Sequence, residues 1–337
     1  MIRAALVLLL CAGAVQAQDA VSLRDAADDL AAIAPGAVIG VWTPDAQQTG
    51  FAGLHYADGP PLDGTEAFHI GSLTKAMTAT LAGRLVDRDL IGWDTTIGDL
   101  LEADKAWHDV TLADLLTHRS GMAANIPRLR AILRPTRPAY VAHMLGRPPE
   151  GPRGDFLYSN AGYVVAGAML EAAGGMPWEE LIQAEVFGPL GMTGAGFGPP
   201  NAVFGHTTAG NPVPPGPRAD NLPAMGPAGT LHATATDMLA FLAAHATRTP
   251  DYLPPGIWDR LHTPVGDYAM GWGLRDGALV HAGSNTLWFA RVQVVPDRAV
   301  FVAINQAGAA AEAGTALALT RLAASDLPAT PEDPPPQ

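Results

Sequence analysis

The sequence predicts a mixed α/β (α+β) fold, in which one antiparallel β-sheet is flanked by helices and carries an inserted, mostly helical subdomain. Strand patterns occur near both ends of the chain, whereas helical patterns fill its middle. Strands that are distant in sequence, with helices between them, are most simply placed in one shared sheet. The 337 residues, 48% of them hydrophobic, are enough to bury a large core.

The N-terminal part of this sheet is predicted from a helix followed by two strands. An amphipathic helix is expected over residues 22–33, with Ser22 as its N-cap. Strands are expected over residues 37–43 and 50–56, joined by a Pro-Asp turn. A long helical pattern then covers residues 72–90.

Helices dominate the middle of the chain, and the last strands and a closing helix follow them. The middle helices are predicted over residues 111–116, 137–144, 161–173, 178–186 and 236–244. Residues 194–226 are rich in proline and glycine and are expected to form loops. Strands are predicted over residues 287–295 and 299–305, and a helix over residues 309–324.

Both ends of the chain are expected to lie outside the folded domain. Residues 1–17 resemble a signal peptide, with Arg3, an apolar run at residues 4–14 and a cleavage site after Ala17. This predicts a periplasmic or secreted protein; an uncleaved membrane anchor or a lipid on Cys11 are the alternatives. Residues 326–337 are polar and proline-rich and predict a disordered tail.

The folded domain is therefore predicted to span residues 18–325. Its sheet subdomain is expected to take about residues 18–90 and 268–325, and its helical subdomain about residues 91–267.

Charge and composition narrow the classes of partner. The net charge is −13 and no basic patch is evident, which argues against nucleic-acid binding. After residue 17 no apolar stretch is long enough to span a bilayer. No metal-ligand spacing, P-loop or C-x-x-C motif occurs, so neither a metal nor another cofactor is predicted. The sequence does not indicate an oligomeric state.

The stretch HIGSLTKAMT, residues 69–78, holds one of only two lysines in a chain with eighteen arginines. Ser72 and Lys75 are three residues apart, so both lie on one face of a helix. A serine needs a base to become a nucleophile, and lysine serves when burial lowers its pKa, whereas arginine keeps its proton. The backbone N–H of Ser72, at the helix start, is a candidate oxyanion donor. The alternative is a capping Ser72 and a solvated Lys75.

Two further stretches place polar groups where loops meet regular elements. In Tyr-Ser-Asn at 158–160, Tyr158 is a candidate proton relay and Asn160 a candidate for holding a substrate carbonyl. The alternative is that Asn160 caps the following helix and Tyr158 packs. In His-Ala-Gly-Ser at 281–284, just before a predicted strand, His281 offers a hydrogen bond and Ser284 a second oxyanion N–H. The His-Arg-Ser-Gly stretch at 118–121 is interpreted as a structural turn.

GSLTK, YSN and HAG, in this order, resemble the three signature motifs of the penicillin-binding protein and class C β-lactamase superfamily, which includes family VIII esterases and D-aminopeptidases. Other segments resemble the family in the same order, at residues 109–122, 158–174, 186–192, 227–241 and 270–273. The resemblance runs from about residue 37 to about residue 305. It implies a β-lactamase/transpeptidase-like fold with a cleft between the sheet and the helical subdomain.

The resemblance also implies roles for individual residues, and it leaves open whether Lys75 or Tyr158 takes the first proton. Catalytic roles are implied for Ser72, Lys75, Tyr158 and His281, and substrate-binding or oxyanion roles for Asn160, Gly283 and Ser284.

The third motif departs from the usual K-T-G of β-lactamases and penicillin-binding proteins. His281 is mostly neutral near pH 7 unless perturbed, and Ala282 lacks a hydroxyl, so both suit a β-lactam carboxylate poorly. We therefore expect a secreted serine hydrolase with an acyl-enzyme on Ser72, cleaving an ester or amide of a small-molecule or peptide substrate, as esterases and D-amino-acid peptidases do. The alternatives are β-lactamase or D-alanyl-D-alanine carboxypeptidase activity, or a non-catalytic peptidoglycan- or ligand-binding protein.

Overall fold

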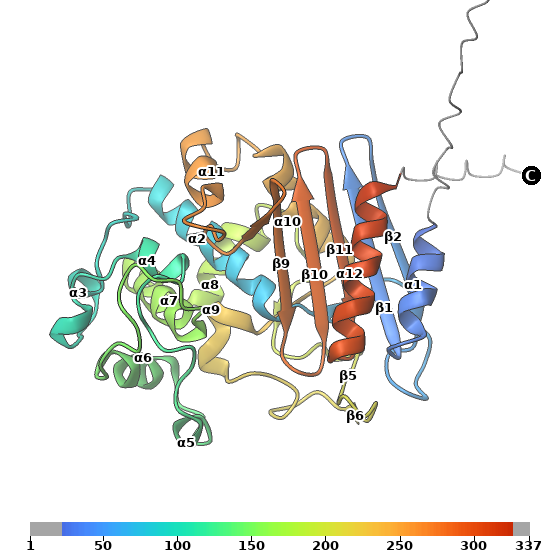
Figure 1. Ribbon diagram of the computed structural model, residues 1–337, viewed down its shortest axis with the longest axis horizontal. Helices are drawn as coiled ribbons and strands as arrows, with labels where there is room; N and C mark the ends of the chain where they lie inside the picture. The colour runs from blue at the N-terminus through green and yellow to red at the C-terminus, as the bar shows by residue number, and fades with distance from the viewer. Residues whose placement is uncertain (1–21, 326–337) are drawn as a thin grey trace, which may run out of the picture.

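The computed structural model describes residues 22–325, and its centre is one six-stranded antiparallel sheet. The strand order is β2-β1-β11-β10-β9-β8, so strands from both ends of the chain meet in its middle (Figure 1). The strands are β1 (Gly36–Thr43), β2 (Ala46–Gly53), β8 (Gly273–Arg275), β9 (Ala278–Ser284), β10 (Phe289–Val295) and β11 (Arg298–Ile304). The predicted antiparallel sheet built from both termini is confirmed.

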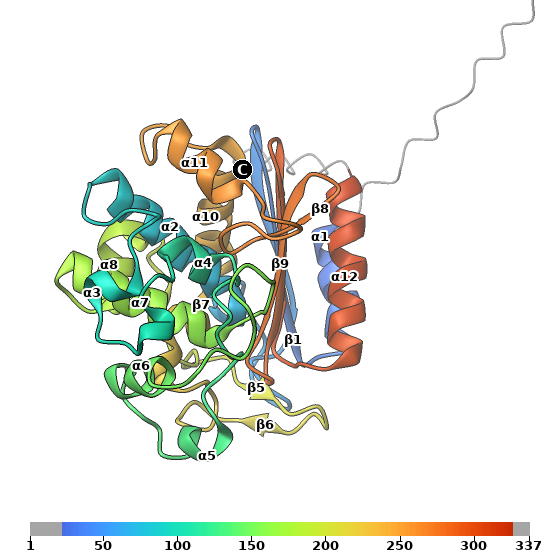
Figure 2. The same ribbon diagram turned by 60° about the vertical axis from the view of Figure 1, so that its left-hand side comes forward.

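Helices cover both faces of this sheet. Helix α1 (Leu23–Ala31) and helix α12 (Ala309–Ala324) pack on one face, and α2 (Thr74–Asp87) and α10 (Ala235–Thr247) lie on the other, as Figure 2 shows. The alternating side chains of the strands therefore enter two hydrophobic cores. For example, Phe289 faces the core under α1 and α12, whereas Ala290 faces the larger core under α2.

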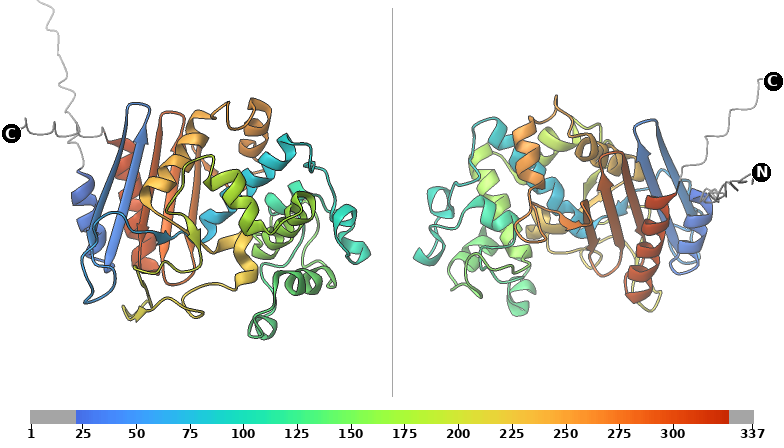
Figure 3. Two further views of the ribbon diagram at one scale, coloured as in Figure 1. Left: turned by 180° about the vertical axis from the view of Figure 1, so that it is seen from behind. Right: turned by 45° about the horizontal axis from the view of Figure 1, so that its top comes forward.

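The remaining helices form the part of the molecule that lies beside the sheet (Figure 3). They are α3 (Ile97–Leu100), α4 (Leu112–Leu116), α5 (Arg128–Ala131), α6 (Arg137–Leu145), α7 (Asn160–Gly174), α8 (Trp178–Ile182), α9 (Gly226–Gly229) and α11 (Pro255–His262), with a π-helical turn at Gln183–Phe187. Short 3-10 turns lie at Gly71–Leu73, Lys105–Trp107 and Pro223–Met225. Within residues 22–325, no helix has the length and apolar character needed to cross a bilayer.

Several predicted elements are correct in kind but differ at their ends. The first helix ends at Ala31, with Ser22 as N-cap, because the Ser22 side chain accepts a hydrogen bond from the Asp25 N–H. Strand β2 begins four residues and ends three residues earlier than predicted, at Gly53, whose φ of 89° breaks the extended run. The closing helix, Ala309–Ala324, has the predicted bounds.

The loop prediction for residues 194–226 was incomplete. This stretch contains three two-residue strands, of which β4 (Gly196–Phe197) pairs with β7 (Leu231–Ala233) outside the stretch, whereas β5 (Gly205–His206) and β6 (Pro212–Val213) pair with each other. Strand β4 joins β7 and β3 (Phe68–His69) in a small sheet, and β3 lies just before the turn that holds Ser72. Such short strands carry too little periodicity to be seen in sequence.

The His-Ala-Gly-Ser stretch does precede the predicted strand, which is β10, but residues 281–284 also form the end of strand β9, which was not predicted. Alanine, leucine and valine begin this strand, but histidine and glycine interrupt its apolar pattern. Strand β8 pairs only with residues 278–280, so among the described residues no strand pairs with the outer edge of β9 from His281 onward. The predicted signal peptide and the predicted tail both lie outside the described residues.

Candidate active site

Ser72 lies in a tight turn that leads directly into helix α2. The turn, Gly71–Leu73, is a 3-10 segment, and Gly71 takes a φ of 51°, a conformation that favours glycine. The Thr74 hydroxyl donates to the Gly71 carbonyl at 2.7 Å and fixes the turn. Ser72 is therefore presented at the N-terminal end of a buried helix, where the first N–H groups have no partner within the helix.

Lys75 is completely buried one turn later, and its ammonium has no carboxylate partner within residues 22–325. Its Nζ donates to Ser72 Oγ at 3.1 Å, to Asn160 Oδ1 at 2.7 Å and to the Ala228 carbonyl at 2.7 Å. Removal from water lowers the pKa of Lys75 to about 7. The alternative of a solvated Lys75 is therefore wrong.

Asn160 opens helix α7, but its side chain does not cap the helix. The cap is Ser159, whose hydroxyl accepts from the Gly162 N–H at 2.8 Å. The Asn160 amide is thus left for the site, where Oδ1 accepts from Lys75 and Nδ2 donates to Asn125 Oδ1 at 2.9 Å. Asn125 orients this amide, and no motif in the sequence marked it.

Tyr158 lies against Lys75, with the lysine Nζ 5.0 Å from the centre of its ring. Burial raises the pKa of Tyr158 to about 12, although the nearby Ser72 hydroxyl opposes the shift. Its phenol therefore stays protonated at neutral pH.

His118 supports Tyr158 from behind. The ring centres are 4.2 Å apart, and His118 Nδ1 accepts from the Ser159 N–H at 3.0 Å. Burial, followed by the charge of Lys75, lowers the pKa of His118 to about 2, so this ring is neutral. The interpretation of residues 118–121 as a turn agrees with the left-handed φ of 58° at His118, but the ring also holds the Tyr-Ser-Asn stretch in place.

His281 faces the same cluster from strand β9. Its Nδ1 lies 2.7 Å from the Ala282 carbonyl, which can only accept, so Nδ1 carries the proton. Its Nε2 therefore accepts from the Tyr268 hydroxyl at 3.2 Å. Burial, and then the charge of Lys75, lower the pKa of His281 to about 4. His281 is thus a neutral ring of fixed tautomer, held by Tyr268, a residue that the sequence motifs did not reveal.

The end of β9 lies directly against the nucleophile turn. A Cβ atom on Gly283 would lie 2.0 Å from the Ile70 carbonyl and 2.7 Å from the Ser72 nitrogen. A Cβ on Gly71 would lie 2.4 Å from the Ser284 nitrogen. The Ser284 hydroxyl is held in its own turn, donating to the Trp288 carbonyl at 2.7 Å. Two glycines thus allow the backbones that carry the nitrogens of Ser72 and Ser284 to approach each other closely.

A histidine–aspartate pair supports the nucleophile turn on its buried side. His69 Nδ1 accepts from the Gly71 N–H at 3.1 Å, so its Nε2 donates to Asp220 Oδ1 at 2.8 Å. His69 stacks on Trp288, with ring centres 5.5 Å apart. The loop that carries Asp220 is therefore tied to the residues around Ser72.

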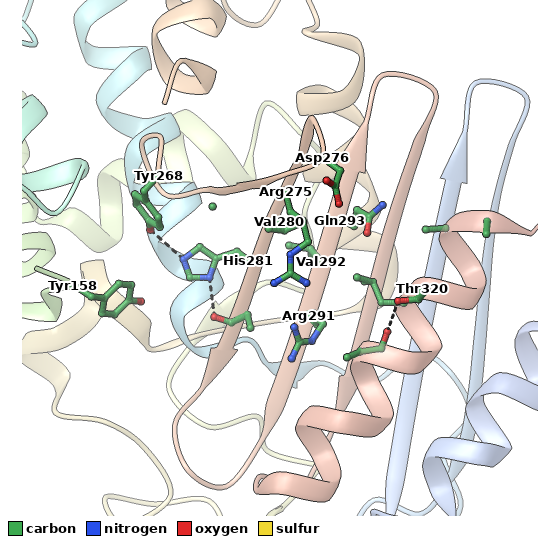
Figure 4. A pocket seen from close by; sticks show the side chains of 16 residues that line it. Tyr158, Tyr268, Arg275, Asp276, Val280, His281, Arg291, Val292, Gln293 and Thr320 are labelled. Atoms are coloured by element: carbon green, nitrogen blue, oxygen red, sulfur yellow. Dashed lines mark hydrogen bonds between the residues drawn. The ribbon is translucent and has the colours of Figure 1, made fainter. Parts of the chain in front are cut away.

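A cavity of about 690 Å³ begins at Tyr158, Tyr268 and His281 and continues around the open edge of β9 (Figure 4). Beyond that edge it reaches Arg275 and Arg291, on the face of the sheet that carries α12. In residues 22–325, no three His, Cys, Asp or Glu side chains come together as metal ligands would. The site around Ser72 thus consists of a serine, a lysine that readily loses its proton near neutral pH, phenols, amides and backbone N–H groups.

The family model described as Beta-lactamase matches residues 23–325, which is nearly all of the described structure. The chain belongs to the beta-lactamase family. The resemblance of its three motifs to this superfamily is therefore confirmed, as is the β-lactamase/transpeptidase-like fold.

One curated relative of this family member is penicillin-binding protein 4 of Amycolatopsis lactamdurans. The two are 27% identical over 312 residues, which cover 82% of this chain and 82% of that protein. Among solved structures, SurE superposes with a TM-score of 0.77 at 23% identity, over 93% of this chain and 79% of SurE. The D-amino acid amidase of Ochrobactrum anthropi SV3, complexed with L-phenylalanine amide, gives a TM-score of 0.73 at 19% identity, over 90% and 97% of the two chains.

Proposed function

We propose that this beta-lactamase family member is a serine hydrolase that forms an acyl-enzyme on Ser72 and cleaves an ester or amide rather than a β-lactam. The observation that carries this proposal is the buried Lys75, whose Nζ lies 3.1 Å from Ser72 Oγ and whose pKa is about 7. A general base works best when its pKa lies near the working pH.

The neighbours of Lys75 favour it as the first base. Asn160 Oδ1 and the Ala228 carbonyl can only accept hydrogen bonds. In its neutral form the amine has two N–H groups, which those two oxygens occupy, so that its lone pair points at the Ser72 hydroxyl. Ser72 then loses its proton to Lys75 as its oxygen attacks the substrate carbonyl carbon.

The rest of the step follows from the groups around Ser72. The N–H groups of Ser72 and Ser284 stabilise the oxyanion that forms on the carbonyl oxygen. Tyr158, protonated because its pKa is about 12, passes a proton to the leaving oxygen or nitrogen and regains one from Lys75. Water then attacks the acyl-enzyme with the same groups, and Ser72 is released.

The substrate preference follows from His281 and its partners. With a pKa of about 4, the His281 ring carries no charge at neutral pH, and both of its nitrogens already have partners. A β-lactam carboxylate would thus meet no cation at this position. The ring and the open edge of β9 suit an uncharged acyl group or a peptide strand instead. D-amino-acid amides and short acyl esters are the substrates we propose.

A fluorophosphonate probe tests the nucleophile. Wild type is expected to be labelled on Ser72, and Ser72→Ala is expected to remain unlabelled, as seen by intact mass and peptide mapping. Ser22→Ala, which removes a serine far from the cleft, serves as the control and should label like wild type. Folded wild type that resists the probe would refute the proposal.

A substrate panel tests the preference within the hydrolase class. Short acyl esters and D-amino-acid amides should show a higher kcat/KM than a chromogenic cephalosporin. Fast cephalosporin turnover would refute the role given to the neutral His281. No turnover of any substrate would favour a binding protein on this scaffold.

The place of action is proposed to be the periplasm or the exterior of the cell, on the basis of residues 1–17 alone. N-terminal sequencing of the protein from its native cells should find Gln18 as the first residue. A chain that still begins at Met1, or a lipid on Cys11, would contradict this.

A further inference from the structure

The segment of residues 128–134, which contains α5, presents an unusual surface of apolar and basic side chains. Leu129, Ile132 and Leu133 are 82%, 68% and 69% exposed, the highest values of any large hydrophobic side chains in residues 22–325. They lie within five consecutive positions, at the tip of a loop that projects from the helical half of the molecule (Figures 1 and 2). Scattered exposed leucines are ordinary, but a cluster of this kind marks an interaction site.

Arginines surround these apolar side chains. Arg128, Arg130 and Arg134 are exposed within the same segment, and none of them forms an ion pair among the described residues. The Arg134 guanidinium donates to the Pro217 carbonyl at 3.1 Å, which places the exposed Arg218 next to the segment. We call residues 128–134, together with Arg218, the basic apolar tip.

The sequence around the tip is locally basic, whereas the chain as a whole is acidic. Residues 115–149 contain six arginines and no aspartate or glutamate, although the whole chain has a net charge of −13. Two carboxylates on neighbouring helices, Glu171 and Glu179, are both bound to Arg137, which offsets one of their two negative charges. Composition as a whole had indicated no basic patch, because the average over the chain hides this local excess.

We propose that the basic apolar tip docks this protein on a membrane surface rich in anionic lipid. Leucine and isoleucine side chains enter the boundary between headgroups and acyl chains, and arginines bind the lipid phosphates, as in other interfacial segments. The positive charge of the tip favours an anionic lipid surface. A second copy of the chain that bound tip to tip would instead bring two equally basic surfaces together. Docking of this kind lies on the bilayer and does not span it.

The position of the tip gives the docking a consequence for the active site. Residues 123–127 lead into α5, and the Ala124 carbonyl accepts from the Asn160 N–H at 2.9 Å. Asn125, in the same loop, holds the Asn160 amide that binds Lys75. Docking of the tip therefore places residues 123–127, the loop that contacts Asn160, close to the lipid surface. The docking itself does not depend on the proposed hydrolysis.

Vesicle co-sedimentation tests the proposal with phosphatidylglycerol–phosphatidylcholine vesicles and with vesicles of phosphatidylcholine alone. The full chain is compared with a chain that begins at Gln18, which keeps all described residues, so that the apolar run at residues 4–14 is not the cause of binding. Both chains are expected to bind the anionic vesicles, and binding should weaken as sodium chloride is raised.

Matched double variants separate the tip from the rest of the surface. Leu129→Ser/Leu133→Ser should weaken binding about tenfold, whereas Leu90→Ser/Leu317→Ser, at 43% and 53% exposed positions elsewhere, should not. Arg128→Gln/Arg130→Gln should weaken binding about 25-fold, roughly fivefold for each arginine. Arg24→Gln/Arg321→Gln, at ion-paired sites far from the tip, is the charge control.

Three results would overturn the proposal. One is failure of the chain from Gln18 to bind anionic vesicles; another is equal loss of binding in the tip and control variants. The third is a wild-type dimer in sedimentation velocity that Leu129→Ser/Leu133→Ser converts to a monomer, since the tip would then bind a second copy. Vesicle binding needs no turnover, so an inactive but vesicle-bound protein would refute the proposed function and leave this inference standing.

Discussion

At the scale of the single residue, Lys75 shows how burial sets chemistry. An ammonium that loses its water without gaining a carboxylate keeps its proton less tightly. Its three partners are a hydroxyl, a side-chain amide and a backbone carbonyl, all uncharged. The lysine thus holds a pKa of about 7, where its neutral form is well populated. Arginine at this position would remain charged.

Asn160→Asp should shift the pH dependence of acylation. A carboxylate 2.7 Å from Nζ favours the ammonium and raises the pKa of Lys75 by about one to three units. Wild-type kcat/KM should rise with pH through about 7 as Lys75 loses its proton, and the rise should move upward in the variant. Asn211→Asp, on an exposed turn, adds the same charge as a control. An unmoved acid limb in Asn160→Asp would mean that another group titrates.

Lys75 should also leave a signature in stability. Its folded-state pKa of about 7 lies below the ordinary value of 10.5, so between these values the unfolded chain binds a proton that the folded chain lacks. The wild-type free energy of unfolding should therefore rise with pH above 7, relative to Lys75→Met, by about 1.4 kcal/mol per pH unit. Urea unfolding between pH 7 and 9 measures this difference. Parallel curves for the two proteins would contradict the depressed pKa.

At the scale of the element, the site depends on how β9 meets the turn before α2. Strand β9 ends in glycine and serine, and the turn begins with a left-handed glycine, so their backbones approach within distances that a Cβ would prevent. Strand β8 stops before this point and leaves the outer edge of β9 open. The geometry of the proposed oxyanion donors is therefore a property of two elements that meet, not of either sequence motif by itself.

Gly283→Ala should reduce kcat by about 10²- to 10³-fold, the usual loss when an oxyanion donor is displaced. The new Cβ would lie 2.0 Å from the Ile70 carbonyl, so β9 must move away from the turn. Gly256→Ala, on helix α11 with nothing within 4 Å of the added Cβ, is the matched control and should keep wild-type kcat. Steady-state kinetics with a short acyl ester and a circular dichroism spectrum of each variant provide the check. Full activity in Gly283→Ala would exclude the proposed oxyanion pair.

At the scale of the whole molecule, buried histidines make the free energy of unfolding sensitive to low pH. The pKa of His118 falls to about 2 and those of His262 and His281 to about 4, while that of His245 lies well below its ordinary value, in each case chiefly through burial. All four rings lie next to other histidines or to Lys75, within the packed interior or the cleft. The folded chain therefore keeps these rings neutral where the unfolded chain charges them.

The free energy of unfolding should consequently fall as the pH drops from 6.5 towards 4. Each ring whose folded pKa is depressed adds about 1.4 kcal/mol per pH unit to this loss, because only the unfolded chain takes up the proton. His262→Gln, which keeps a donor for the 2.9 Å contact with His245, should remove one such contribution. Urea unfolding at several pH values measures the slopes. An identical slope in His262→Gln would contradict the assignment.

Much of the fold could be predicted because its signals are local. The closing helix has its predicted bounds, and Ser22 caps the first helix, since periodicity and capping act over a few neighbouring residues. The ends of β2 and the existence of β8 could not be predicted, because pairing partners far along the chain decide them. Residues 69–78 indicated the Ser72–Lys75 pair for the same local reason: three residues separate them.

The sequence by itself determined the family, the sheet made from both ends of the chain, and the residue types at the nucleophile, the Tyr-Ser-Asn stretch and the altered third motif. Only the tertiary structure decided which of those residues act together. Lys75 is buried and donates to a carbonyl 153 residues away, Asn160 is left uncommitted by the cap at Ser159 and is oriented by Asn125, and His281 is kept neutral chiefly by burial while Tyr268 donates to its Nε2. The physical reason is that a pKa, a tautomer or an exposed basic tip depends on what surrounds a group in space, and those surroundings come from distant parts of the chain.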